Sequence, residues 1–303
     1  MILEFWQGVG DPFRAAAVIV RAFVDIGSLA TAGLALFLVF MSGELTTEET
    51  RSARRWLLLM ALIGLIANFG SFPLQAIEVA RGPQGAQRAE IYALVMRSPF
   101  GDALLLRSGG ILLALAALAR SAGAAGIATV GAVLVAASYV AAGHTTQFRP
   151  RQELVVILTL HMTALAFWFG GLLGVRAVAL RRDPESAAET LYVWARQAGF
   201  FFLLALGAGL LAAWYLGGTW RSLTESWFGW IVFAKSAIVL FVLASVYAAR
   251  FRHLPLMARG DVLAAAALRR SAGRQFLLGV LLIYLSAELA FVAPLDIGHR
   301  LPL

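Results

Sequence analysis

Long apolar runs recur from one end of this 303-residue chain to the other, and they constrain the fold more than any other feature. A helix needs about 20 apolar residues to cross the hydrocarbon core of a bilayer. Only 14% of the residues are charged, whereas roughly a quarter is usual in soluble proteins. We therefore predict an all-α fold, a polytopic membrane helix bundle of about eight transmembrane helices with no separate soluble domain. The expected spans are 14–42, 56–80, 102–120, 123–143, 154–180, 198–217, 227–250 and 272–294.

The net charge of +8 does not indicate nucleic-acid binding, because the basic residues are spread over short loops. Arginine is more frequent in the loops after the odd-numbered spans, for example at Arg181 and Arg182. Since cytoplasmic loops accumulate Lys and Arg, this bias predicts that both termini lie outside the cytoplasm. We expect a multi-pass protein of the bacterial inner membrane with periplasmic termini.

Short segments of the two halves of the chain resemble each other in the same order. SPFGDALLLRS (98–108) and SWFGWIVFAKS (226–236) share Ser, Phe, Gly, a basic residue and Ser at identical spacing. DIGSLA (25–30) corresponds to HMTALA (161–166) in the same way. An even number of spans per repeat makes the two repeats parallel. The pattern predicts two parallel four-helix repeats, residues 1–150 and residues 151–303.

Ionisable side chains within the spans are concentrated toward one side of the membrane. Charged groups are costly there, and they usually mark a transport path or a structural pair. Arg107 and Lys235 occupy equivalent repeat positions, and each is expected either to pair with a carboxylate such as Glu78 or Glu288 or to line a path.

Two of the four histidines are candidate metal ligands. His144 and His161 are expected at similar depth on consecutive antiparallel helices, and neutral imidazole is a common ligand of copper, zinc and iron. The repeat aligns His161 with Asp25 and His144 with Asp296, which predicts a site with nitrogen and oxygen ligands. The chain has no cysteine, so thiolate ligation is excluded. A hydrogen-bonded structural role is the alternative for an isolated membrane histidine.

Several of these segments resemble the CopD/PcoD copper-resistance family of inner-membrane proteins. LHMTALAFWFGGLLGV (160–175) is similar to the family's His-containing segment ending in Trp-x-Gly-Gly, and AAGHTTQ (141–147) to its Gly-His-Ala stretch. The paired helix starts at 98–107 and 228–236, and the segment 268–282, also resemble the family.

The resemblance implies a role in moving or handling copper across the inner membrane, with a periplasmic copper-binding partner of the CopC type. It carries the family's histidines onto His144 and His161. The first helix of the family often bears His where this chain has Asp25, so a site of four histidines is not expected.

The sequence is also compatible with two other functions. A helix bundle with two histidines can hold haem b between axial imidazoles for electron transfer, although the CxxCH motif of covalent haem is absent. A membrane scaffold for a periplasmic copper chaperone would use the same polar residues structurally. The chain contains no phosphate-binding loop, GxSxG elbow or HExxH motif, so we expect no enzyme.

Overall fold

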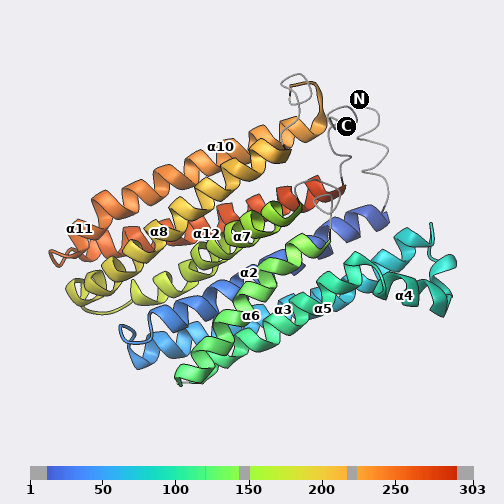
Figure 1. The fold of residues 1–303 in the computed structure, drawn as a ribbon. Helices are drawn as coiled ribbons and strands as arrows, with labels where there is room; N and C mark the ends of the chain where they lie inside the picture. Colours follow the sequence, from blue (N-terminus) through green and yellow to red (C-terminus); the bar gives the residue numbers. More distant parts are fainter. Residues whose placement is uncertain (1–11, 120, 143–150, 217–223, 292–303) are drawn as a thin grey trace.

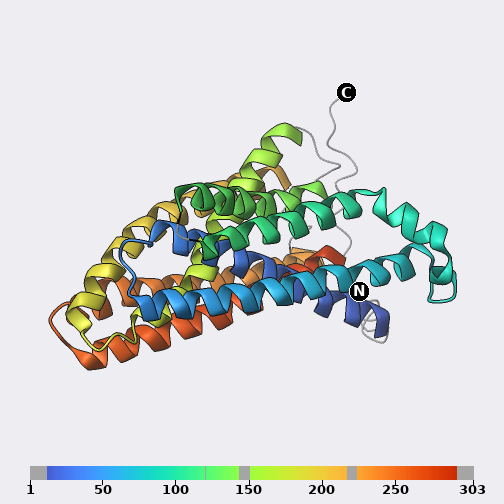
Figure 2. The ribbon, with the colours of Figure 1, turned by 90° about the horizontal axis from the view of Figure 1, so that it is seen from below.

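The computed structural model describes residues 12–119, 121–142, 151–216 and 224–291, and this part of the chain is helical throughout its regular structure. The helices run side by side along one direction (Figures 1 and 2). Eight of them are long and apolar enough to cross a membrane, which confirms the predicted all-α polytopic bundle. The elements in chain order are α2 (Pro12–Phe40), α3 (Thr47–Val79), η1 (Gly85–Gln87), α4 (Ala89–Met96), α5 (Pro99–Ala114), η2 (Leu115–Leu118), α6 (Ala122–Ala141), α7 (Arg151–Val178), α8 (Pro184–Leu216), α10 (Trp227–Ala248), η4 (Ala249–His253), α11 (Leu254–Met257) and α12 (Val262–Phe291).

Several helices begin earlier than their apolar spans. α3 begins at Thr47, α8 at Pro184 and α12 at Val262, each nine or more residues before the expected start. The start of α3 has a capping box, in which Thr46 accepts from the Glu49 amide and Glu49 accepts from the Thr46 amide. Polar first turns are helical but lie outside the apolar run, so an apolar window alone misses them.

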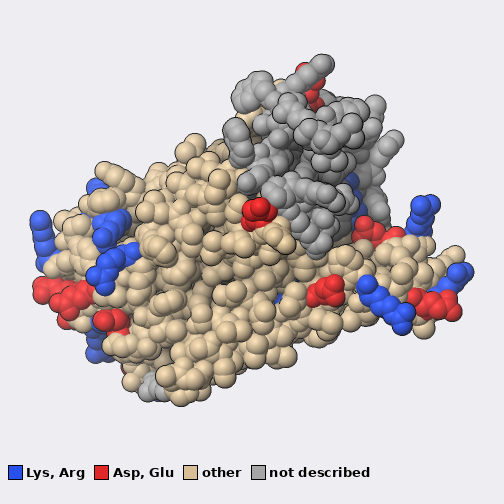
Figure 3. Space-filling model, viewed as in Figure 1, with Lys and Arg blue, Asp and Glu red and all other residues tan. Residues whose placement is uncertain are grey.

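Charged residues gather at the two ends of the bundle, and the middle of the visible face is almost free of them (Figure 3). Large apolar side chains are instead exposed along the spans, among them Ile66, Phe200 and Phe241, each at least 65% exposed. Such a broad apolar surface fits contact with lipid rather than water. Lipid therefore surrounds the helices at this level.

α2 is the central helix of the bundle. In its most apolar stretch 78% of the residues are buried, against 11% in the span that contains α10. Val18 and Ala22 of α2 pack with Ala287 of α12, so the described chain starts and ends at the same end of the bundle. We call this the N/C end; the opposite end carries α11 (Figure 1).

Two small residues let α2 and α7 approach each other closely. A Cβ atom on Gly33 would overlap the Ala166 carbonyl, and one on Gly170 would lie 2.6 Å from the Ala30 carbonyl oxygen. Small residues at crossings are a general device of membrane helices, where close backbone approach supplies the packing energy. Further along both helices, Gly174 faces Phe37, so α2 and α7 run parallel.

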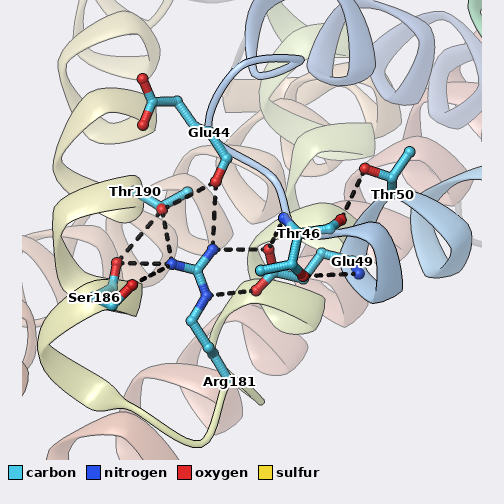
Figure 4. A network of polar contacts seen from close by, with 7 residues as sticks. All are labelled: Glu44, Thr46, Glu49, Thr50, Arg181, Ser186 and Thr190. Carbon is cyan, nitrogen blue, oxygen red and sulfur yellow. Dashed lines mark hydrogen bonds and ion pairs between the residues drawn. The ribbon is translucent and has the colours of Figure 1, made fainter.

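A polar network at the α11 end joins the α2–α3 connection to the α7–α8 connection (Figure 4). Arg181 Nε donates to Glu49 Oε1 at 2.9 Å and Arg181 Nη2 donates to Glu49 Oε2 at 2.8 Å. Nη1 donates to Ser186 Oγ and Thr190 Oγ1. Hydrogen bonding to Glu49 raises the pKa of Arg181, so its guanidinium stays charged at physiological pH.

Candidate functional site

A buried polar cluster lies between α2, α3, α5 and α6, in the half of the bundle toward the N/C end. Each of its fully buried members is at most 7% exposed. Burying polar groups at membrane depth is costly unless they bind one another. A buried cluster of this kind is therefore a candidate functional site. The members are Asp25, Asn68, Arg107, Ser108 and Ser138, with Arg21 and Tyr139 at its edge.

Arg107 is held by uncharged groups. Its Nε donates to Ser138 Oγ and its Nη1 donates to Asn68 Oδ1, both at 3.2 Å. The guanidinium carbon lies 4.9 Å from the centroid of the Tyr139 ring, a cation–π distance. Asn68 in turn donates to Ser108 Oγ at 2.9 Å. A carboxylate pair was one of the two roles considered for Arg107, and the groups that hydrogen-bond to it in the described part of the chain are neutral.

The two carboxylates considered for Arg107 lie elsewhere. Glu78 is exposed near the end of α3. Glu288 accepts a hydrogen bond from Tyr284 one turn earlier on α12, at 3.1 Å. Neutral amide and hydroxyl groups on α3 and α6 instead accept two of the five N–H donors of Arg107.

Asp25 is only half satisfied. Its Oδ2 accepts from Arg21 Nε at 3.2 Å, one turn earlier on α2. Its Oδ1 is buried and has no hydrogen-bond partner among the described residues, and the same is true of the Tyr139 hydroxyl. The two side chains lie near the range of a hydrogen bond to each other, although the geometry falls short of one. A buried carboxylate oxygen without a donor is an available ligand for a cation or a proton.

His161 projects from α7 toward α8 with one ring nitrogen engaged. Its Nδ1 lies 2.8 Å from the Ala205 carbonyl oxygen. Because a carbonyl can only accept, this bond places the proton on Nδ1 and leaves the lone pair on Nε2. A backbone carbonyl that fixes the second nitrogen is the usual arrangement of a metal-ligating histidine. Gly209 leaves room for the ring, since a Cβ there would lie 2.9 Å from Cε1.

Lys235 in the second half is bound much as Arg107 is in the first. Its Nζ donates to Ser286 Oγ of α12 at 2.9 Å. In both halves the cation near the start of the third span is thus bound by a serine of the fourth span. Lys235 is also close enough to interact electrostatically with His161.

The structure describes two of the four predicted metal ligands, Asp25 and His161. His144 and Asp296 lie outside the described residues. Asp25 precedes Gly33 by eight positions on α2, and His161 precedes Gly170 by nine on the parallel helix α7, so the two lie at similar depth. Within the described ranges, no three His, Asp or Glu side chains come together to hold a metal.

Sequence reasoning that looked only for charges and histidines missed the neutral part of the cluster. Asn68, Ser108, Ser138 and Tyr139 were not singled out, although Asn68 stands in the middle of the apolar run of α3 and could have been noticed there. The pairing of Arg181 with Glu49 was also missed, because sequence spacing carries no information on contacts between loops 132 positions apart.

The buried cluster lies within a segment that matches a known protein family. Residues 11–148 match the family described as copper resistance protein D-like, N-terminal domain. Searches of curated proteins and of solved structures found no match. The matched segment contains α2 to α6, hence the whole buried cluster and His144, whereas His161, Lys235 and Glu288 lie beyond it. Over residues 11–148, this chain is therefore similar to the copper resistance protein D-like family.

Proposed function

We propose that this protein moves or handles copper across the bacterial inner membrane, with both termini in the periplasm and a His-centred metal site on the periplasmic side. The observation that carries the proposal is the buried, half-satisfied Asp25 inside a domain of a copper-resistance family. Copper is the cargo in this account. His144, His161, Asp25 and Asp296 are the ligands we propose, and a CopC-type periplasmic protein is the proposed partner.

The chemistry of the two described ligands supports copper. Asp25 offers Oδ1, which has no hydrogen-bond partner within the described part of the chain, and His161 offers Nε2, because the bond to Ala205 fixes the tautomer of the imidazole. Imidazole nitrogen with carboxylate oxygen suits Cu(II). Arg21 binds the other oxygen of Asp25, which holds the carboxylate in one orientation.

The packing of α2 against α7 supports a site shared by two related halves. Asp25 and His161 stand at equivalent positions of the proposed repeat, and their helices run parallel in close contact. We propose that His144 and Asp296 complete the site at the N/C end, with Arg107 and Lys235 as fixed cations that shape the path beside it.

His161→Ala is expected to abolish copper accumulation above the level of the empty vector. The change removes one of few nitrogen ligands, and loss of a ligand weakens a metal site by an order of magnitude or more. The measurement is cell-associated copper by elemental analysis, at matched membrane expression, in a host lacking its own homologue. Thr163→Val, two positions along the same helix, removes a hydroxyl that donates to the Thr159 carbonyl within α7, and it is expected to leave accumulation unchanged.

Other results would contradict the proposal. Unchanged accumulation in His161→Ala would favour the scaffold role, in which the polar residues serve only the fold. A Soret band with sharp reduced α and β bands in the purified protein, lost in His161→Ala, would instead identify a haem b electron carrier.

A further inference from the structure

We propose that the α11 end of the bundle carries a binding site for the phosphate group of an anionic phospholipid. This site lies between α7, η4 and α12, at the opposite end from Asp25, and it does not depend on the copper proposal. Its lining includes Arg176, His253, Arg269, Arg270, Arg274 and Leu277, around a cavity of about 780 Å³. Basic residues gather at this end in the space-filling view (Figure 3).

The basic side chains of this groove have no partner of their own. None of the four arginines makes an ion pair or hydrogen bond within the described ranges, where the ion pairs join Arg21 to Asp25 and Arg181 to Glu49. His253 is close enough to Arg270 and Arg274 to interact with their charge. Several like charges around one cavity repel each other, and an anion in the cavity relieves that repulsion.

The backbone makes room for one of these arginines to reach across the groove. A Cβ on Gly273 would lie 2.5 Å from Arg176 Nη1, so the guanidinium of α7 rests directly against α12 at this glycine. Arg270 and Arg274 flank Gly273 on α12, one turn apart on the same face. The π-helical turn η4 places His253 on the third side. Basic groups from three segments thus converge on one volume.

The depth of the groove favours a lipid over free phosphate. Arg176 lies two residues before the end of the α7 span, and the arginines of α12 lie in the first half of a 29-residue span. Since about 20 residues cross the hydrocarbon core, a span of this length extends into the headgroup level, where we place the groove. Leu277, one turn deeper on α12, is 67% exposed and continues the groove along the apolar surface. Basic pockets between membrane helices on the cytoplasmic side bind anionic headgroups in this way. An acyl chain would follow Leu277 while the phosphate meets the arginines.

The test compares lipid retention by the full chain in neutral detergent, measured by native mass spectrometry. The protein is supplied with an equimolar mixture of phosphatidylglycerol and phosphatidylcholine. We expect wild type to retain phosphatidylglycerol preferentially, and Arg270→Gln with Arg274→Gln to lower that preference by about 25-fold, at about fivefold per arginine. Both side chains are exposed, so folding should be retained.

A charge-matched control separates the groove from general electrostatics. Arg51→Gln with Arg55→Gln removes two exposed arginines from α3 outside the groove and is expected to keep the preference. An equal loss in this control, or no loss in the groove variant, would overturn the proposal. Displacement of phosphatidylglycerol by equimolar inorganic phosphate would also overturn it, because a free anion would then be the preferred ligand.

Discussion

Gly33→Ala is expected to destabilise the protein by about 3 kcal/mol, at the upper end of the usual cost of overpacking. The added methyl group would overlap the Ala166 carbonyl, and a backbone carbonyl cannot move aside by changing rotamer. α2 and α7 would have to separate along their whole contact. We expect a clearly lower midpoint of thermal unfolding in detergent and a loss of copper accumulation, since the proposed copper site draws ligands from both helices.

Gly70→Ala is the matched control for this prediction. Gly70 lies within α3, where an added Cβ meets no atom within 4 Å. Alanine has a higher helix propensity than glycine, so this change is expected to be neutral or slightly stabilising. Equal unfolding midpoints for the two variants would show that the α2–α7 contact is not the close crossing described above.

Glu49→Gln is expected to cost about 2–3 kcal/mol of stability, because it leaves Arg181 without its charged partner in a largely buried network. The Glu49 side chain is 6% exposed and that of Arg181 is 14% exposed, so solvent screens the pair only weakly. The change also weakens the capping box of α3. A lower midpoint of thermal unfolding in detergent is the expected readout.

Glu48→Gln is the control for the ion pair. Glu48 precedes Glu49 in the same first turn of α3 but is exposed, so its loss changes net charge and the helix dipole equally. We expect no measurable change in the midpoint of thermal unfolding beyond the small effect of losing a charge near the helix dipole. If Glu48→Gln lowered the midpoint as much as Glu49→Gln, charge at the helix start rather than the bond to Arg181 would be the cause.

The apolar runs were sufficient to predict the spans, because the bilayer demands long uninterrupted hydrophobic helices whatever their neighbours. The apolar runs were not sufficient to predict the residues at which the helices begin. Glu185 lies in the first turn of α8 and Arg269 in the third turn of α12. An apolar window rejects such residues, although they continue the helix into the headgroup region. The division into two parallel repeats stays a prediction.

The candidate site was harder to predict than the fold. Charge and depth were enough to single out Asp25, Arg107, His161 and Lys235, since each is costly in a membrane. Their partners are a matter of helix rotation and crossing, which one sequence does not encode locally. Arg107 illustrates this: a carboxylate such as Glu78 was considered as its partner, whereas Asn68 and Ser138 accept its hydrogen bonds.

The central claim is that copper binds this protein through imidazole, and X-ray absorption at the copper edge of the copper-loaded, purified protein tests it most directly. We expect imidazole nitrogen scattering at about 2 Å from the metal in wild type, and less of it in His161→Ala. A copper spectrum without imidazole scattering, or one unchanged by His161→Ala, would contradict it.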